Sequence, residues 1–174
     1  MAPLDAAHSP LDGRRVIRDI NTVGWHVARV PPAGGHHGWA FSVGFAQTFD
    51  HPEVAIFGLP DDVLRALLDT IGRHLRAGRT FRDGHEDATL APPFRFVFRA
   101  VDPAWRAAVL PVASWFYGDR SFTAVQSFWP DRAHRLPWEE GFDPDLVGFQ
   151  PLLFHDDATA ARVGPLLASS PAAD

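Results

Sequence analysis

Apolar residues recur along the chain with two different periods, and each period predicts one kind of element. In residues 60–78 they recur every three or four positions, which is the spacing of one face of a helix. Residues 9–24 repeat this pattern, with Ser9 as the expected N-cap and Pro10 as the first helical residue. Two amphipathic helices are therefore predicted.

Alternation with a period of two predicts strands. Phe94, Phe96 and Phe98 alternate with two arginines and a valine, which indicates a strand with one apolar face. Residues 31–38, rich in Gly and Pro, form the expected loop of a hairpin. Shorter apolar runs predict further strands at residues 25–30, 39–45, 54–59 and 122–129.

A third helix is expected over residues 104–115, after the start signal Asp102-Pro103 and with a bend or an end near Pro111. The order of elements lacks the regular alternation of strand and helix that builds a parallel sheet. We therefore predict an α+β fold, in which a mainly antiparallel sheet of about five strands packs with two or three helices.

Length and composition fit one folded domain. The chain has 174 residues, of which 46% are hydrophobic and 21% are charged, close to the average of globular proteins. Residues 9–163 form the expected single domain, between a flexible N-terminus of residues 1–8 and a flexible C-terminal tail of residues 164–174. No apolar run approaches the ~20 residues of a spanning helix, and the N-terminus lacks signal-peptide features, so a cytoplasmic protein without a membrane partner is expected.

Two residue types are missing, and each absence removes classes of chemistry. Without cysteine, this chain has no disulfides, thiolate nucleophiles or cysteine-ligated metal sites. All 16 basic residues are arginines, so Schiff-base catalysis and a P-loop lysine are excluded as well. A net charge of −5 argues against nucleic acid as a partner. The expected partner is a small molecule or a peptide, and a homodimer stays open.

His51-Pro52-Glu53 lies in a predicted turn between two strands and supplies a histidine and a carboxylate two residues apart. Such a pair can act as a general base and the group that orients it. The alternative is that His51 caps the turn while Glu53 binds nearby backbone. The H-x-E pattern also occurs in zinc deaminases, but their cysteine ligands are missing here.

Residues 40–44 resemble a degenerate nucleophile elbow, in which a helix follows the serine directly. Here the apolar strand pattern continues to Phe45. Ser42 is therefore expected inside a strand, and a nucleophilic role is not favoured.

Aromatic and polar residues gather after the last predicted strand. Trp129-Pro130-Asp131 resembles the acid loop of tyrosine phosphatases, which attack with a cysteine that this chain lacks. With Gln126 and Trp138 nearby in the sequence, these residues can line a ligand pocket. The alternative is that the tryptophans pin a coil segment onto the sheet and that Asp131 forms a turn.

The sequence holds few cofactor signals, and no cofactor is favoured. His36 and His37, in the loop of residues 31–38, are the candidate metal ligands, but no ligand-spaced pair such as H-E-x-x-H accompanies them. An aromatic hairpin can accept a flavin, yet no flavin fingerprint is present. A run of arginines at every third position is interpreted as a solvated helix face; it comprises Arg73, Arg76, Arg79 and Arg82.

Several short motifs, taken in order, resemble a known family. They are Gly24-Trp25-His26, Phe41-Ser42-Val43-Gly44, His51-Pro52-Glu53-Val54, Phe57-Gly58-Leu59-Pro60, Gln126-Ser127-Phe128-Trp129-Pro130-Asp131, Leu136-Pro137-Trp138 and Gln150-Pro151-Leu152-Leu153. Across residues 21–153 their order and spacing resemble the bacterial domain of unknown function 4262 family (DUF4262). The resemblance implies a small bacterial intracellular domain and brings no established reaction. The long loop at residues 31–38 departs from the family pattern, which puts a role for His36 and His37 in doubt.

The leading hypothesis is a small-molecule or peptide pocket, with His51, Glu53 and Asp131 as candidate catalytic residues. Acid–base chemistry of the hydrolase or isomerase type, without a covalent intermediate, is what these side chains can perform. The alternative is a non-enzymatic interaction module of the immunity or regulatory type that binds through exposed aromatic residues. The residues expected to line the pocket are Trp25, His26, Ser42, Gln126, Trp129, Trp138 and Gln150.

Overall fold

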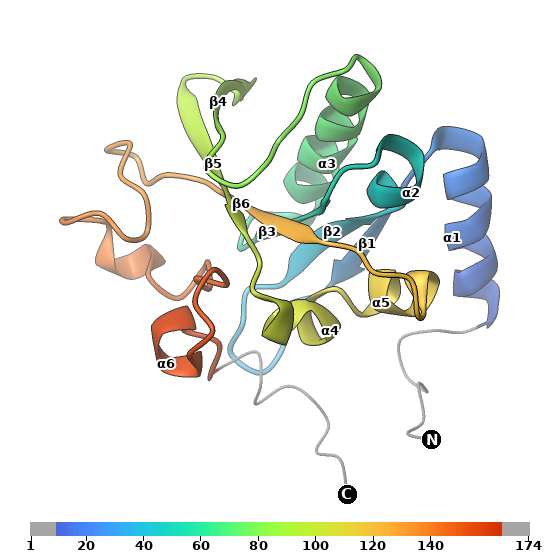
Figure 1. Cartoon of the computed structure of the whole chain (residues 1–174). Helices are drawn as coiled ribbons and strands as arrows, with labels where there is room; N and C mark the ends of the chain where they lie inside the picture. The colour runs from blue at the N-terminus through green and yellow to red at the C-terminus, as the bar shows by residue number, and fades with distance from the viewer. Residues whose placement is uncertain (1–9, 165–174) are drawn as a thin grey trace, which may run out of the picture.

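The computed structural model of the protein describes residues 10–164, in which one sheet carries helices on both faces (Figure 1). Ser9, the expected N-cap, and residues 1–8, the expected flexible N-terminus, lie outside the described residues. The same holds for the expected C-terminal tail, apart from residue 164.

The described residues contain six strands, six α-helices and two 3₁₀ helices. The strands are β1 (His26–Val30), β2 (Trp39–Val43), β3 (Glu53–Phe57), β4 (Glu86–Ala91), β5 (Phe94–Ala100) and β6 (Ala124–Phe128). The helices are α1 (Pro10–Val23), α2 (Phe45–Phe49), α3 (Asp61–Arg76), α4 (Arg106–Val109), α5 (Pro111–Tyr117) and α6 (Ala158–Ala161), with the 3₁₀ helices η1 (Pro103–Trp105) and η2 (Pro144–Leu146). Among these residues, no helix has the length and apolar character needed to cross a membrane.

The strands are ordered β1-β2-β3-β6-β5-β4 across the sheet. Neighbouring strands are antiparallel except β3 and β6, which run parallel with Glu53 opposite Ala124. The α+β class is confirmed, but the expected five strands and two or three helices are wrong, and the sheet is mixed. A parallel pair needs a long crossover connection. Here α3, β4, β5, α4 and α5 lie between the two strands in the sequence, so no local pattern reveals the pairing.

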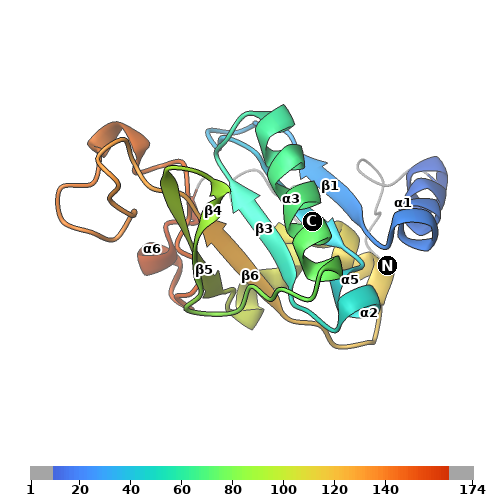
Figure 2. The same cartoon turned by 90° about the horizontal axis from the view of Figure 1, so that it is seen from above.

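The two faces of the sheet are covered by different helices (Figure 2). Helix α3 packs on one face, against apolar residues of β2, β3, β5 and β6. On the other face α1, α4, α5 and α6 share a core with apolar residues of β1, β2, β3 and β6. Strand β1 contacts both α1 and α3, and the figures show α1 standing beside the sheet edge that β1 forms.

The predicted helix after Pro60 is confirmed as α3. Asp61 and Asp62 lie in its first turn, where carboxylates favour the positive end of the helix dipole. Gly72 lets the Trp25 ring lie directly against the helix, since a Cβ at this position would come within 2.6 Å of the ring. The apolar stripe that faces the sheet consists of Leu64, Leu67, Leu68, Ile71 and Leu75.

The alternating phenylalanines form β5, and all three face α3. Phe96 and Phe98 are buried there, and Phe94 packs beside them. Strand β4, which pairs with β5 at the edge of the sheet, is missing from the predicted elements. In its sequence, EDATLA, three of the six residues are exposed and the one buried residue is Asp87, so the strand has no buried apolar face to produce an alternating pattern.

The helix expected over residues 104–115 is divided into η1, α4 and α5. The division falls where expected, because Leu110 leaves the helical conformation and Pro111 begins α5. The strand expected over residues 39–45 is shorter than predicted. It ends at Val43, and α2 begins at Phe45 after the left-handed Gly44.

Candidate functional site

The Glu53 carboxyl group is fully buried at the first residue of β3 and accepts hydrogen bonds from four donors. Its Oε1 accepts the backbone N–H groups of Gly44 and Ala46, at 3.0 and 3.1 Å, and the hydroxyl of Tyr117 at 2.5 Å. Its Oε2 accepts the hydroxyl of Ser42. Glu53 therefore ties β3 to β2, to the start of α2 and to α5.

The electrostatics of this carboxyl group follow from its enclosure. Burial raises the pKa of Glu53 above its ordinary value of 4.5, and the hydrogen bonds offset only part of that effect. Burial, followed by the adjacent Glu53 carboxylate, raises the pKa of Tyr117 as well. Tyr117 therefore remains a hydrogen-bond donor to Glu53 over the whole ordinary pH range.

Ser42 is fully buried in β2 and bonded on both sides. Its hydroxyl donates to Glu53 and accepts the N–H of Val54 at 2.9 Å. Ser42 lies within a strand as expected, although the reason given was wrong, because the strand does not continue to Phe45. Its hydroxyl points into the Glu53 network, and its role in a ligand pocket stays a prediction.

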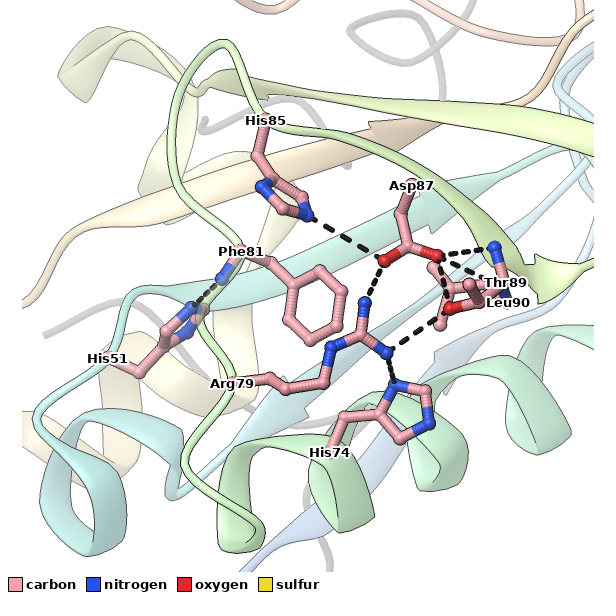
Figure 3. Close-up of polar contacts among 8 residues, drawn as sticks. All are labelled: His51, His74, Arg79, Phe81, His85, Asp87, Thr89 and Leu90. Carbon is pink, nitrogen blue, oxygen red and sulfur yellow. Dashed lines mark hydrogen bonds and ion pairs between the residues drawn. The ribbon is translucent and has the colours of Figure 1, made fainter.

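His51 is 2% exposed, and both of its ring nitrogens are used. Nδ1 donates to the carbonyl of Pro52 at 2.7 Å, and Nε2 accepts the N–H of Phe81 at 2.9 Å (Figure 3). Burial lowers the pKa of His51 below its ordinary value of 6.5 and outweighs the opposing hydrogen bond to Pro52. The catalytic role of His51 stays a prediction, but neither nitrogen is left to serve a ligand as a base.

A second polar network holds the segment between α3 and β5 (Figure 3). The Arg79 guanidinium bonds to Asp87, to His74 Nδ1 at 2.7 Å and to Thr89 at 3.1 Å. Burial alone raises the pKa of Asp87, but the hydroxyl and N–H of Thr89 and the charge of Arg79 outweigh it and lower the pKa. His85 lies on the other side, with Nε2 3.7 Å from the Asp87 carboxylate.

This second network was missed in the sequence and corrects one interpretation made there. Arg79 was assigned to a solvated helix face, yet it pairs with Asp87, whose side chain is 2% exposed. Arg76 is also engaged, bonding to the carbonyl of Val23 and lying over the Trp25 ring. Arg82 also reaches another segment, donating to the carbonyl of Asp50 at 3.3 Å. The Arg73 side chain, by contrast, bonds to Thr70 of its own helix. Three of the four periodic arginines therefore contact other segments of the chain, and only Arg73 fits the solvated face.

Asp131 organises the loop that follows β6. Its Oδ1 accepts the N–H groups of Ala133 and Arg135 at 2.8 and 2.9 Å, and its Oδ2 accepts that of Asp143 at 3.0 Å. Burial acts to raise the pKa of Asp131, and these backbone donors, led by Arg135, outweigh it and lower the pKa. Among residues 10–164, no hydrogen bond or ion pair joins Asp131 to His51, and the catalytic role of Asp131 stays a prediction.

Gln126 and Gln150 bind the C-terminal coil to the sheet. The Gln126 amide donates to the carbonyl of Pro151 at 2.8 Å. Gln150 exchanges two hydrogen bonds with the backbone of Trp129, at 2.9 and 3.0 Å. The Trp129 indole in turn donates to the carbonyl of Phe57 at 2.7 Å. All three side chains are buried, and these contacts fit the alternative in which they fasten a coil segment.

Trp138 packs against a small apolar cluster that includes Val97 of β5 and Phe128 of β6. Its ring meets Phe128 and Phe154 edge-on, at centroid distances of 5.0 and 5.6 Å. The Arg99 guanidinium lies 5.7 Å from the ring centroid. A ligand-lining role for Trp138 stays a prediction.

The candidate metal ligands His36 and His37 point to different partners. His36 Nδ1 accepts the N–H of Gly38 at 3.1 Å, and its ring lies against Trp39. His37 stacks on Phe149 with ring centroids 3.6 Å apart. Within the part of the chain that the structure describes, no three His, Asp or Glu side chains are grouped so that they could hold a metal ion.

A half-open hollow of about 720 Å³ follows the outer edge of the sheet, and we call it the β1 groove. It touches every residue of β1, from His26 to Val30. Successive side chains of a strand point to opposite faces, so a single hollow in contact with all of them must run along the strand edge. The helical residues that line it are Arg15 and Val16 of α1, Val112 of α5, and Asp61, Leu64 and Arg65 of α3.

The β1 groove is apolar at its floor and basic at its rim. Three arginines line it, one each from α1, β1 and α3, against one aspartate, Asp61, although the whole chain carries a net charge of −5. Arg29 pairs with Asp61. Arg15 and Arg65 are 57% and 56% exposed, and each reaches a carboxylate of its own helix only at 3.9 Å. Their guanidinium groups are therefore available to an anionic ligand.

A smaller hollow of about 290 Å³ continues the groove past His26. His26 bonds to Asp19 of α1 at 2.8 Å, and the Trp25 indole donates to Asp69 of α3 at 3.0 Å. Trp25 and His26 are thus the members of the expected pocket that lie at a hollow of the surface. The other members lie elsewhere, in the Glu53 network or in the C-terminal coil layer: Ser42, Gln126, Trp129, Trp138 and Gln150.

Comparison with known proteins places the chain in a family and leaves its activity open. No curated protein and no solved structure shows significant similarity to it. The family described as domain of unknown function (DUF4262) matches residues 19–143, which confirms the resemblance carried by the motifs. Because this match covers more than half of the sequence, the chain belongs to the DUF4262 family.

Proposed function

We propose that the protein is a binding module for a small molecule or peptide, and that the β1 groove is its site. The observation that carries this proposal is the groove itself, a hollow of about 720 Å³ along the outer edge of β1, which has no strand partner among residues 10–164. Ligand sites are typically concave and mostly apolar, with a few polar groups that orient the ligand. The groove combines these properties.

Its apolar floor comes from both faces of the sheet. Val16 and Val112 line it on the α1 side, and Leu64 lines it on the α3 side. Arg15 and Arg65 stand at opposite rims, so a ligand with negative charge gains attraction from both walls.

Binding without catalysis is favoured by the placement of the candidate catalytic residues. His51 and Glu53 are 2% and 0% exposed, and Asp131 is 4% exposed. Each is occupied by hydrogen bonds to the protein itself. A general acid or base must come within about 3 Å of the proton that it transfers, directly or through one water. None of the three lines the β1 groove.

An NMR screen of the purified protein with a library of small fragments and short peptides tests this function. Ligands are expected to shift the backbone amide signals of His26–Val30 and of Arg65 while those of Gln126 and Gln150 stay unchanged. Shifts centred on residues 126–138 would instead support the pocket first expected there, and a library without any binder at β1 would refute the proposal.

A further inference from the structure

The outer edge of β1 is a row of backbone groups without a strand partner in residues 10–164. In an antiparallel pair, alternate residues bond to the neighbour and the others point away from it. Strand β2 pairs with the backbone groups of one alternate set of β1 residues. The other set presents its N–H and C=O groups to the β1 groove, and it consists of either Val27 and Arg29 or His26, Ala28 and Val30. Such an edge is a template for another strand.

The groove has the shape that such a strand needs. Helix α1 stands on one side of the edge and α3 on the other, and both line the hollow. The five residues of β1 are about 17 Å long, which matches a short extended segment. The floor on both sides offers aliphatic contacts to alternating side chains of that segment, from Val16 and from Leu64.

Charge narrows the identity of the occupant. Three arginines against one aspartate line the groove. Arg29 pairs with that aspartate, whereas Arg15 and Arg65 approach carboxylates of their own helices only at 3.9 Å. A second copy of this chain, paired edge to edge through β1, would bring its own arginines against these. An acidic segment would meet them with the opposite sign.

We propose that the free edge of β1 binds an extended acidic peptide segment of a partner protein, which joins the sheet as an additional strand. This inference rests on the proposed function and names the ligand class of the same site. Main-chain hydrogen bonds to β1 supply affinity that does not depend on the side chains of the peptide. Arg15 and Arg65 add specificity for acidic side chains.

Fluorescence anisotropy with a labelled eight-residue peptide of two Val-Val-Glu-Glu repeats, which places valine and glutamate on both faces of a strand, tests the inference. A peptide with lysine in place of glutamate is the charge control. A valine–glutamate peptide N-methylated at every residue keeps the side-chain charge but has no backbone N–H on either edge to pair with a strand. Each control peptide is expected to bind at least about tenfold more weakly, the lysine peptide because it loses a charge-assisted contact and the N-methylated peptide because it loses main-chain hydrogen bonds.

Variants of the protein locate the effect. Arg65→Glu and Arg15→Glu are each expected to weaken binding by about tenfold or more. Arg14→Glu, an exposed neighbour that does not line the groove, changes the net charge equally and should stay within about twofold of wild type. Melting temperatures of all variants confirm that each is folded.

Five results would overturn the inference. Equal binding of the N-methylated peptide would show that no strand is added, and equal binding of the lysine peptide would remove the charge argument. A dimer in sedimentation that dissociates in Arg65→Glu would make a second copy the occupant. If fragments bind at β1 and the peptide does not, the inference fails while the proposed function stands. If neither binds, both fail.

Discussion

Replacement of Glu53 by alanine separates a structural role of this residue from a catalytic one. The substitution removes the acceptor of two backbone N–H groups, those of Gly44 and Ala46, and of the hydroxyls of Ser42 and Tyr117. The hydroxyls can rotate toward other acceptors, whereas the backbone groups at the start of α2 are fixed. We therefore count the backbone donors alone.

The magnitude follows from these two donors. An unsatisfied buried donor costs about 1–3 kcal/mol, and the Ala46 N–H is only partly buried, so the two donors together cost at most about 2–6 kcal/mol. The substitution also removes a carboxyl group whose burial disfavours its charge. Removal of this buried charge offsets part of the cost, so the expected loss in the free energy of unfolding is about 2–4 kcal/mol. That loss is a large part of the total stability of a typical domain, which is about 5–15 kcal/mol.

Urea unfolding at pH 7, followed by tryptophan fluorescence, measures the loss. Tyr117→Phe is the matched control, because it removes one donor to Glu53 and keeps the ring, and it should cost about 1 kcal/mol. If Glu53→Ala unfolds within about 0.5 kcal/mol of wild type at an unchanged m-value, Glu53 does not hold the fold together and the reasoning is refuted.

Three further predictions concern the same interior. The pKa of Glu53 is raised above 4.5 in the folded state. The free energy of unfolding of wild type, relative to that of Glu53→Gln, should therefore fall as the pH rises above 4.5 and through the folded-state pKa. Equal pH profiles of the two proteins in urea titrations would contradict this. The pKa of His51 is lowered below 6.5, so wild type should lose stability relative to His51→Gln as the pH falls below 6.5, and parallel profiles would disprove it. Gly72→Ala should cost about 1–3 kcal/mol in the same assay, because the new Cβ would come within 2.6 Å of the Trp25 ring; an unchanged midpoint would show that the ring moves aside freely.

Elements with strong local patterns could be predicted from the sequence. The apolar stripe of α3, the alternating phenylalanines of β5 and the break at Pro111 each arise from neighbouring residues and survive in the structure. Strand β4 could not be found this way, because its residues are held by pairing with β5 and by the Arg79–Asp87 network instead of by an apolar face. The parallel pairing of β3 with β6 also depends on distant residues.

The polar residues of the site show a similar limit. Sequence reasoning singled out His51, Glu53 and Asp131 as candidate catalytic residues, and all three are buried. Whether such groups face a ligand or the protein depends on donors elsewhere in the chain. The partner of His51 is the N–H of Phe81, thirty residues away, and that of Glu53 includes Tyr117.

The β1 groove had no signal in the sequence for a related reason. Arg15, Arg29 and Arg65 are far apart along the chain and fall into no motif. They meet only because β1 lies at the sheet edge between α1 and α3. A site assembled from single residues of separate elements becomes visible only when the topology is known.

Amide hydrogen exchange of β1, with and without the valine–glutamate peptide, tests the central claim most directly. The outward N–H groups of His26–Val30 alternate with those bonded to β2, and they should exchange fast in the free protein. We predict that the peptide slows exchange at these alternate positions and leaves Gln126 and Gln150 unchanged. Exchange at His26–Val30 that is the same with and without saturating peptide would contradict the assignment of β1 as the binding edge.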